Sequence, residues 1–349
     1  MTESYRIAIV GAASLRGKEL NETLAESSFA GADFLLMDDR LALGQLETVG
    51  DEVTFVQEIA PSSFERVDFA FFAGDASITR RHWESALSAG ASIVDLTYVL
   101  EGEAGVLVRA PWIDEGASSA APVVSPPGLQ TAAVVPAHPA AAALALLLER
   151  LQTAGTIESA SATVFEPASE YGRAAMDELH QQTISLLSFQ TLPKNIYDMQ
   201  IAFNAIPAAG EEAKINLVET EERVRRHYSL LAANRLPRLS LQLIHVPVFH
   251  GHCFSIAISF ERPIAAEHVE SALSGAHVEI VPGDADAPSN LTSVGQEEIL
   301  VRLRQEGGSG APSRHFWLWA ATDNLKLSAR NAVECAQELR RLRPRGTVQ

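Results

Sequence analysis

The sequence predicts an α/β protein, in which a parallel, doubly wound sheet is followed by an α+β region. Two observations support this fold class. In the first third of the chain, short continuous apolar runs alternate with helical segments, as strands do when both faces of a parallel sheet are covered. From about residue 156, apolar and polar residues alternate within the strands, which is typical of a mixed or antiparallel sheet with one covered face.

Length and charge narrow the range of functions. A chain of 349 residues can form two domains, each with its own core, and a net charge of −17 argues against a nucleic-acid or anionic-membrane partner. The two cysteines, Cys253 and Cys335, give neither a disulfide framework nor a zinc-binding spacing. The few residues before the first strand leave no room for a signal peptide, and the longest apolar run, 140–148, is too short to span a bilayer. We therefore expect a cytoplasmic protein.

The first strand leads into a glycine turn. Residues 5–10 (YRIAIV) are strongly apolar, Gly11 and Gly17 follow, and a helix is expected over 17–25. A strand, a glycine turn and a helix are the context in which a Rossmann-type domain binds the pyrophosphate of a dinucleotide. Ser14 replaces the middle glycine of that pattern, so the match is imperfect.

The second strand ends in charged residues at the distance where ribose contacts arise. Asp38 would accept hydrogen bonds from ribose hydroxyls and repel a 2′-phosphate, whereas Arg40 would attract one. The sequence thus leaves NAD and NADP open, and a solvated strand end without any ligand is a further interpretation. The apolar strand 67–73 closes on Gly74, which we expect to contribute to the same nucleotide site.

The rest of the chain is organised around the stretch 122–151. It consists of an apolar strand end, a tight Ser-Pro-Pro-Gly loop and a long Ala/Leu-rich helix. The predicted helix begins near Gly128 to Thr131, where its free amides and positive dipole end would suit an activated nucleophile or a bound anion. Gly128, however, has no side chain.

Several motifs together resemble the aspartate-semialdehyde dehydrogenase family. They are the GAxxxxG turn, the PP-loop before a helix, FxPxSxYGxxAMDELHQQT, EEAKINLVET, VPVFHGHCF and TDNLKLSARNA. The resemblance extends from about Tyr5 to Leu339. It implies a Rossmann-type domain over 1–135, completed by a C-terminal helix within 325–349, and an α+β domain over 136–324 that forms a homodimer. The implied chemistry is the NADPH-dependent reductive dephosphorylation of aspartyl phosphate through a cysteine thiohemiacetal and a thioester.

The residues at the family's functional positions depart from its pattern. The Asn-Pro-Asn-Cys turn that carries the nucleophile matches Ser-Pro-Pro-Gly, ending at Gly128. A substrate-binding Gln matches Glu166, and the Ser-Gly-x-Gly segment beside the nicotinamide contains Glu170 and Tyr171. Glu101 stands where an Arg would bind the substrate phosphate.

At the family's other functional positions, one residue is changed and several are retained. His245 stands where an Arg would bind the substrate carboxylate. His252 matches the general acid/base, Glu219 and Lys214 match substrate-binding residues, and Asn324 matches a residue of the last helix on the cofactor side.

Because the chain resembles this family but lacks the nucleophilic cysteine, we predict a catalytically inactive homologue that acts as a binding or scaffold protein. Cys253 adjoins His252 on a predicted strand and should therefore point to the opposite face, as a buried small residue. We expect NADP or NAD to bind weakly or not at all, a homodimer through about 156–320, and a possible small-molecule ligand in the interdomain cleft. No metal is expected, although His250, His252 and Glu219 could suggest one. The alternative is an active NAD(P)-dependent oxidoreductase of this family, in amino-acid biosynthesis or with an altered substrate.

Overall fold

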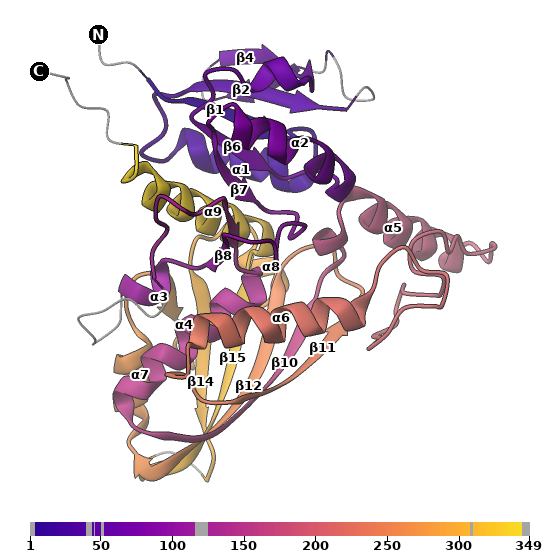
Figure 1. The fold of residues 1–349 in the computed structure, drawn as a ribbon. Coiled ribbons are helices and arrows are strands. Elements are labelled where there is room, and N and C mark those ends of the chain that lie inside the picture. Colours follow the sequence, from indigo (N-terminus) through magenta and orange to yellow (C-terminus); the bar gives the residue numbers. More distant parts are fainter. Residues whose placement is uncertain are drawn as a thin grey trace, which may run out of the picture. The chain divides into compact units, whose positions relative to one another are not determined.

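The computed structural model describes residues 4–39, 44, 46–49, 52–115, 125–307 and 310–343 (Figure 1). The chain divides into two compact units. Unit 1 comprises Met1–Trp112, Val124–Ala137 and Ser328–Gln349, and unit 2 comprises Ile113–Val123 and His138–Leu327.

Unit 1 contains a parallel sheet. Among the described residues the sheet has seven strands in the order β5-β2-β1-β6-β7-β9-β8, and every neighbouring pair is parallel. Its strands and the small β3-β4 hairpin are β1 (Arg6–Val10), β2 (Asp33–Asp38), β3 (Leu46–Val49), β4 (Glu52–Phe55), β5 (Gln57–Glu58), β6 (Phe69–Phe72), β7 (Ser92–Asp95), β8 (Val106–Arg109) and β9 (Ala133–Pro136). The helical segments are α1 (Leu15–Ala25), η1 (Pro61–Phe64), α2 (Ala76–Ser88), α3 (Trp112–Glu115) and α9 (Asn324–Arg340), the last of which begins in unit 2.

The strands of this sheet are apolar throughout because both of its faces are covered. In β1, Ile7 and Ile9 belong to one core cluster and Ala8 and Val10 to another. Successive side chains of a strand point to opposite faces, so two clusters mean two buried faces. The predicted doubly wound α/β fold of the N-terminal part is confirmed.

The prediction that a helix begins at Gly128 is wrong. Gly128 lies in a turn in which its amide donates to the Thr131 hydroxyl (2.9 Å) and its carbonyl accepts from the Thr131 amide (2.9 Å). Strand β9 follows, and the helix begins only at Pro139. The reason is local: two consecutive valines at 134–135 favour a strand, and a proline is well suited to the first turn of a helix.

Unit 2 contains a mixed sheet. Within the described part of the chain it has six strands in the order β11-β10-β12-β15-β14-β13, of which β10-β11 and β13-β14 pair in parallel and the others antiparallel. The strands are β10 (Ile157–Glu166), β11 (Leu239–His245), β12 (His252–Ile264), β13 (Val278–Ile280), β14 (Ile299–Gln305) and β15 (Ser313–Thr322). The helical segments are α4 (Pro139–Ala154), η2 (Ala168–Tyr171), α5 (Arg173–Leu187), α6 (Leu217–Ala232), α7 (Ala266–Leu273) and α8 (Asn290–Ser293).

Helices α4, α6 and α7 cover one face of the mixed sheet (Figure 1). Strand β10 shows the expected alternation, because Ala160, Ala162 and Val164 are buried while Ser159 and Ser161 are exposed. The helix side of the sheet ends in polar residues, since Glu166 and His245 are the last residues of β10 and β11. This end of the sheet positions the candidate site.

The close crossing of two backbones in unit 1 gives a test of the fold. A Cβ atom on Gly11 would lie 2.2 Å from the Cα of Gly74, and Gly11 has φ of +86°. We expect Gly11→Ala to lower the free energy of unfolding by about 3 kcal/mol or more, because overpacking adds to backbone strain. The control is Gly31→Ala, where a Cβ meets nothing within 4 Å. Urea unfolding with equal midpoints for the two variants would contradict the crossing.

Candidate functional site

In unit 1, three glycines hold the turn after β1 against its neighbours. Gly11 crosses Gly74, as described above, and a Cβ on Gly17 would lie 2.1 Å from the Gly11 carbonyl oxygen. The turn can therefore pack this closely only with glycine at these positions. These three residues, all predicted at a nucleotide site, do lie together.

Ser14 and Asp38 are also part of this turn. Ser14 caps α1, since its hydroxyl accepts from the Gly17 amide (2.9 Å) and donates to the Ala73 carbonyl (2.8 Å). Asp38 is only 9% exposed, and its carboxylate accepts from the amide of Ala13 (2.8 Å). Asp38 is therefore not a solvated strand end. The residues form the strand, glycine turn, capped helix and terminal acid of a dinucleotide-binding architecture. Arg40 lies outside the described residues.

Gly128 lies at the opposite end of the strands of the same sheet, the end at which the parallel strands begin. It lines a hollow of about 370 Å³ together with Ser92 and Ala133, at the amino ends of β7 and β9. The Gly11 turn follows the carboxyl end of β1, and all these strands run in parallel. Gly128 is thus neither at a helix start nor at the nucleotide edge. Glu101 lies in the connection between β7 and β8, where its amide donates to the Tyr98 carbonyl (3.4 Å).

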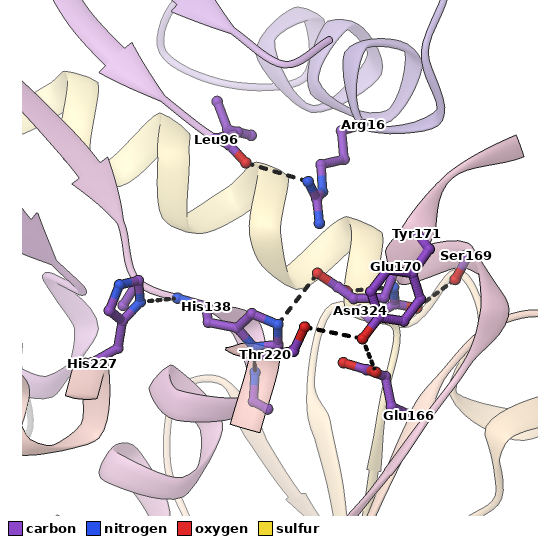
Figure 2. A network of polar contacts seen from close by, with 12 residues as sticks. Arg16, Leu96, His138, Glu166, Ser169, Glu170, Tyr171, Thr220, His227 and Asn324 are labelled. Atoms are coloured by element: carbon purple, nitrogen blue, oxygen red, sulfur yellow. Dashed lines mark hydrogen bonds and ion pairs between the residues drawn. The ribbon is translucent and has the colours of Figure 1, made fainter. Parts of the chain in front are cut away.

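In unit 2, the helix start expected at Gly128 is found instead at His138, which directly precedes α4 (Figure 2). The His138 Nδ1 accepts from the Ala140 amide (3.2 Å), which places the ring proton on Nε2. That Nε2 lies 3.3 Å from Oε1 of Glu170. The His138 amide donates to Nδ1 of His227 (2.9 Å), so the residue is fixed through both its ring and its backbone. His138 was not predicted; a lone histidine before a proline gave only a weak signal.

Asn324 binds the other oxygen of Glu170. Its Nδ2 donates to Oε2 of Glu170 (3.1 Å), and its Oδ1 accepts from the Gly251 amide and the Ser169 hydroxyl (both 3.1 Å). Asn324 was predicted on the cofactor side of the site. In the structure its side chain is used within unit 2, in a network of buried residues (Figure 2).

A second polar group lies at the ends of β10 and β11. Glu166 and His245 are register partners on these parallel strands, and both are fully buried. The Tyr171 hydroxyl donates to Oε2 of Glu166 (2.7 Å) and lies 3.0 Å from the Thr220 hydroxyl, as Figure 2 shows. Burial, followed by the charge of Glu166, raises the pKa of Tyr171 well above its ordinary value, so it is a neutral donor. Tyr171 therefore provides a hydrogen bond to one oxygen of a carboxylate that the fold has buried.

His245 is packed between aromatic rings. Its ring centroid lies 4.9 Å from that of Tyr197 and 6.0 Å from that of Tyr171. Its ring nitrogens have no hydrogen-bond partner among the residues that the structure describes, and burial lowers its pKa to about 4. At neutral pH, His245 is uncharged and cannot replace a guanidinium as an anion anchor.

The remaining predicted residues are distributed differently. His252 begins β12, is fully buried, and has its ring centroid 5.8 Å from that of His138. Glu219 and Lys214 are exposed instead. Glu219 lies in the first turn of α6, where its carboxylate pairs with Arg223 at 3.1 Å. Of the predicted substrate-binding residues in unit 2, only His245 is therefore buried.

Neither cysteine is at the helix start. Cys253 follows His252 on β12 and is buried, as expected, and burial raises its pKa to about 11. Cys335 lies in α9, fully buried, and burial likewise raises its pKa well above the ordinary value. Both are protonated thiols at neutral pH, whereas the nucleophile must be a thiolate. Within the described ranges, no three His, Cys, Asp or Glu side chains are grouped so as to hold a metal ion.

The chain was compared with known proteins. Residues 6–126 match the model of the semialdehyde dehydrogenase NAD binding domain, and residues 148–327 match that of the semialdehyde dehydrogenase dimerisation domain. The second match indicates a homodimer. Among the described residues, no helix is long and apolar enough to cross a membrane.

Similar proteins span nearly the whole chain. The aspartate-semialdehyde dehydrogenase of Rickettsia bellii is 27% identical over 97% of this chain and 98% of its own length. The USG-1 protein homolog of Azotobacter vinelandii is 30% identical, with the same coverage. The solved structure of a probable aspartate-semialdehyde dehydrogenase from Pseudomonas aeruginosa has a TM-score of 0.80 at 27% identity, over 98% of this chain and 100% of that chain.

The lowered pKa of His245 predicts a pH dependence of stability. The unfolded side chain binds a proton near its ordinary pKa of 6.5, whereas the folded one does so only near 4. Stability from this residue is therefore complete above pH 6.5 and is lost as pH falls toward 4. Between pH 7 and 4.5, wild type should lose about 2–3 kcal/mol more than His245→Phe, which has no ring to protonate. Urea unfolding with the same loss in both proteins would contradict this pKa.

Proposed function

The chain belongs to the aspartate-semialdehyde dehydrogenase family, and from this premise we propose that it no longer performs the phosphorylating dehydrogenase reaction and acts as a binding or scaffold protein. One observation carries the proposal. By the resemblance, the position of the family's nucleophilic cysteine is that of Gly128, which has no side chain, and both cysteines of the chain are buried, protonated thiols elsewhere. Without a thiolate at that position, the covalent route of acyl transfer has no nucleophile.

The charges of the buried groups also oppose the family's substrate. Aspartyl phosphate is an anion, and the family resemblance implies two arginines that bind it. By that resemblance, His245 stands at one of these positions and Glu101 at the other, and burial keeps His245 neutral. Glu166 and Glu170 add two buried carboxylates, which repel an anion at close range. Substrate binding would therefore be lost together with the nucleophile.

The nucleotide end of unit 1 supports weak binding only. Its architecture fits a dinucleotide, but three amides of the turn are already used: Gly11 and Ala12 donate to the Met37 carbonyl, and Ala13 donates to Asp38. A pyrophosphate bound at such a turn depends on free backbone amides. Asp38 also opposes the 2′-phosphate of NADP.

The scaffold role is consistent with the uncovered face of the mixed sheet. On the face opposite α4, α6 and α7, Ser161, Thr163 and Trp317 line a shallow hollow of about 280 Å³, and Trp317 is 37% exposed. An exposed tryptophan among small side chains is typical of a surface that packs against another. We assign this face to the homodimer contact.

The loss of activity is testable with restored thiols. Wild type should show no phosphate-dependent NADPH formation from aspartate semialdehyde. Gly128→Cys should fold, because a Cβ there meets nothing within 4 Å, and should remain inactive because of its place at the far edge of the sheet. His138→Cys should also remain inactive unless a neutral residue replaces Glu170 and Glu101→Arg, Glu166→Gln and His245→Arg are added, since each missing charge-assisted anchor costs about 1.5–3 kcal/mol. Clear turnover by either single variant would show that the pocket is intact.

Weak cofactor binding is a separate prediction. We expect NADP to bind with a dissociation constant above about 0.1 mM, near −5.5 kcal/mol. Calorimetric titration is the measurement, with NAD as the comparison because it lacks the 2′-phosphate that Asp38 opposes. A low-micromolar constant for NADP would favour the alternative function, an oxidoreductase of this family with an altered substrate. The retained glycine turn and capped α1 are the observations in favour of that alternative.

A further inference from the structure

The short helix η2 inserts two consecutive side chains into two buried polar recesses. Glu170 enters the recess formed by His138 and Asn324, and Tyr171 enters the one formed by Glu166 and Thr220 (Figure 2). We propose that η2 is a built-in plug, in which the Glu170 carboxylate is an intramolecular ligand of a recess able to bind a small monocarboxylate. This inference rests on the proposed function, because it assumes that no dehydrogenase substrate binds in this recess.

The donors of the recess are fixed in place before any carboxylate is considered. The Ala140 amide binds Nδ1 of His138, so the ring presents an N–H at Nε2. The Gly251 amide and the Ser169 hydroxyl bind Oδ1 of Asn324, so its amide group presents Nδ2. Both groups are held from behind and face different oxygens: Asn324 Nδ2 donates a hydrogen bond to Oε2 (3.1 Å), and His138 Nε2 lies 3.3 Å from Oε1. Such a pair forms a preorganised carboxylate site.

Contacts of the backbone hold η2 over this recess. The amides of Ala168 and Ser169 donate to the carbonyls of Val248 and Phe249, both at 2.9 Å. Gly172 then has φ of +81°, which lets the chain turn into α5. Glu170 is consequently only 7% exposed, so a free carboxylate cannot compete for the recess while the side chain occupies it.

Removing the Glu170 side chain should empty the recess, take away the acceptor of Asn324 Nδ2 and remove the carboxylate beside His138 Nε2. In Glu170→Ala we expect the melting temperature to fall by about 5–15 °C, because breaking a buried pair strands the remaining partner. Acetate should then bind in place of the lost carboxylate. At 50 mM, sodium acetate should raise the melting temperature of this variant by about 3 °C relative to sodium chloride at the same concentration.

Wild type and Glu219→Ala are the matched controls. Glu219 is a glutamate of the same unit, but its side chain is 59% exposed. Acetate and chloride should have equal effects on both controls, and calorimetry should show one acetate site per chain in Glu170→Ala alone. Adding His138→Ala to Glu170→Ala should abolish the acetate effect. An acetate effect that is equal in all variants, or that survives the loss of His138, overturns the proposal.

A milder variant covers the case in which Glu170→Ala does not fold. Glu170→Gln keeps the shape of the side chain but loses its charge, and we expect a melting temperature below that of wild type. A melting temperature equal to that of wild type overturns the plug. None of these measurements depends on dehydrogenase turnover. An active wild type with an acetate-dependent Glu170→Ala would refute the proposed function alone, whereas an inactive wild type without that effect would refute the plug alone.

Discussion

A carboxylate taken out of water must be paired, and this constraint determines the site in unit 2. Glu166 and Glu170 are both buried, and the cost of leaving such a charge alone would be several kcal/mol. Glu170 is therefore bound by His138 and Asn324, and Glu166 by Tyr171. The departures from the family's pattern are thus not independent changes. The two acids, the tyrosine and the histidine at the helix start form one set in which each member requires another.

Packing also determines the residues of the glycine turn in unit 1. A glycine pattern after a first strand is usually taken as a sign of cofactor binding, but here every glycine of the pattern also has a packing role. Gly11 and Gly74 cross at a distance that no Cβ would allow, and Gly17 lies against the Gly11 carbonyl. These residues would be required by the fold even if no nucleotide bound. Their presence supports the domain architecture but does not by itself support cofactor affinity.

The sequence was sufficient for the fold class because that depends on repeated patterns. Continuous apolar strands predicted the parallel sheet, and alternating residues such as 159–164 predicted the half-covered one. The position of the helix start was not predictable in the same way. Strand β9 has only four residues and lies between proline-containing segments, so its two valines could be taken as part of a helix. The error placed the expected helix start at Gly128 instead of at Pro139.

The contacts of the site were beyond sequence reasoning for a different reason. Glu166 and His245 are 79 positions apart, and only the register of β10 against β11 makes them neighbours. The role of either residue depends on its contact partner, and the sequence alone does not identify that partner. Tyr171 could be predicted as an obstruction, but its bond to Glu166 required the structure.

The coupling of these residues also restricts how the dehydrogenase chemistry could be rebuilt. A cysteine introduced at position 138 would remove the partner of Oε1 of Glu170 and leave a buried carboxylate with less stabilisation. That thiol would also lie beside the Glu170 carboxylate, whose charge would raise its pKa and disfavour the thiolate. Glu170 would therefore have to be replaced first, or together with His138. The pairing that stabilises Glu170 is thus the same interaction that would disfavour a thiolate at position 138.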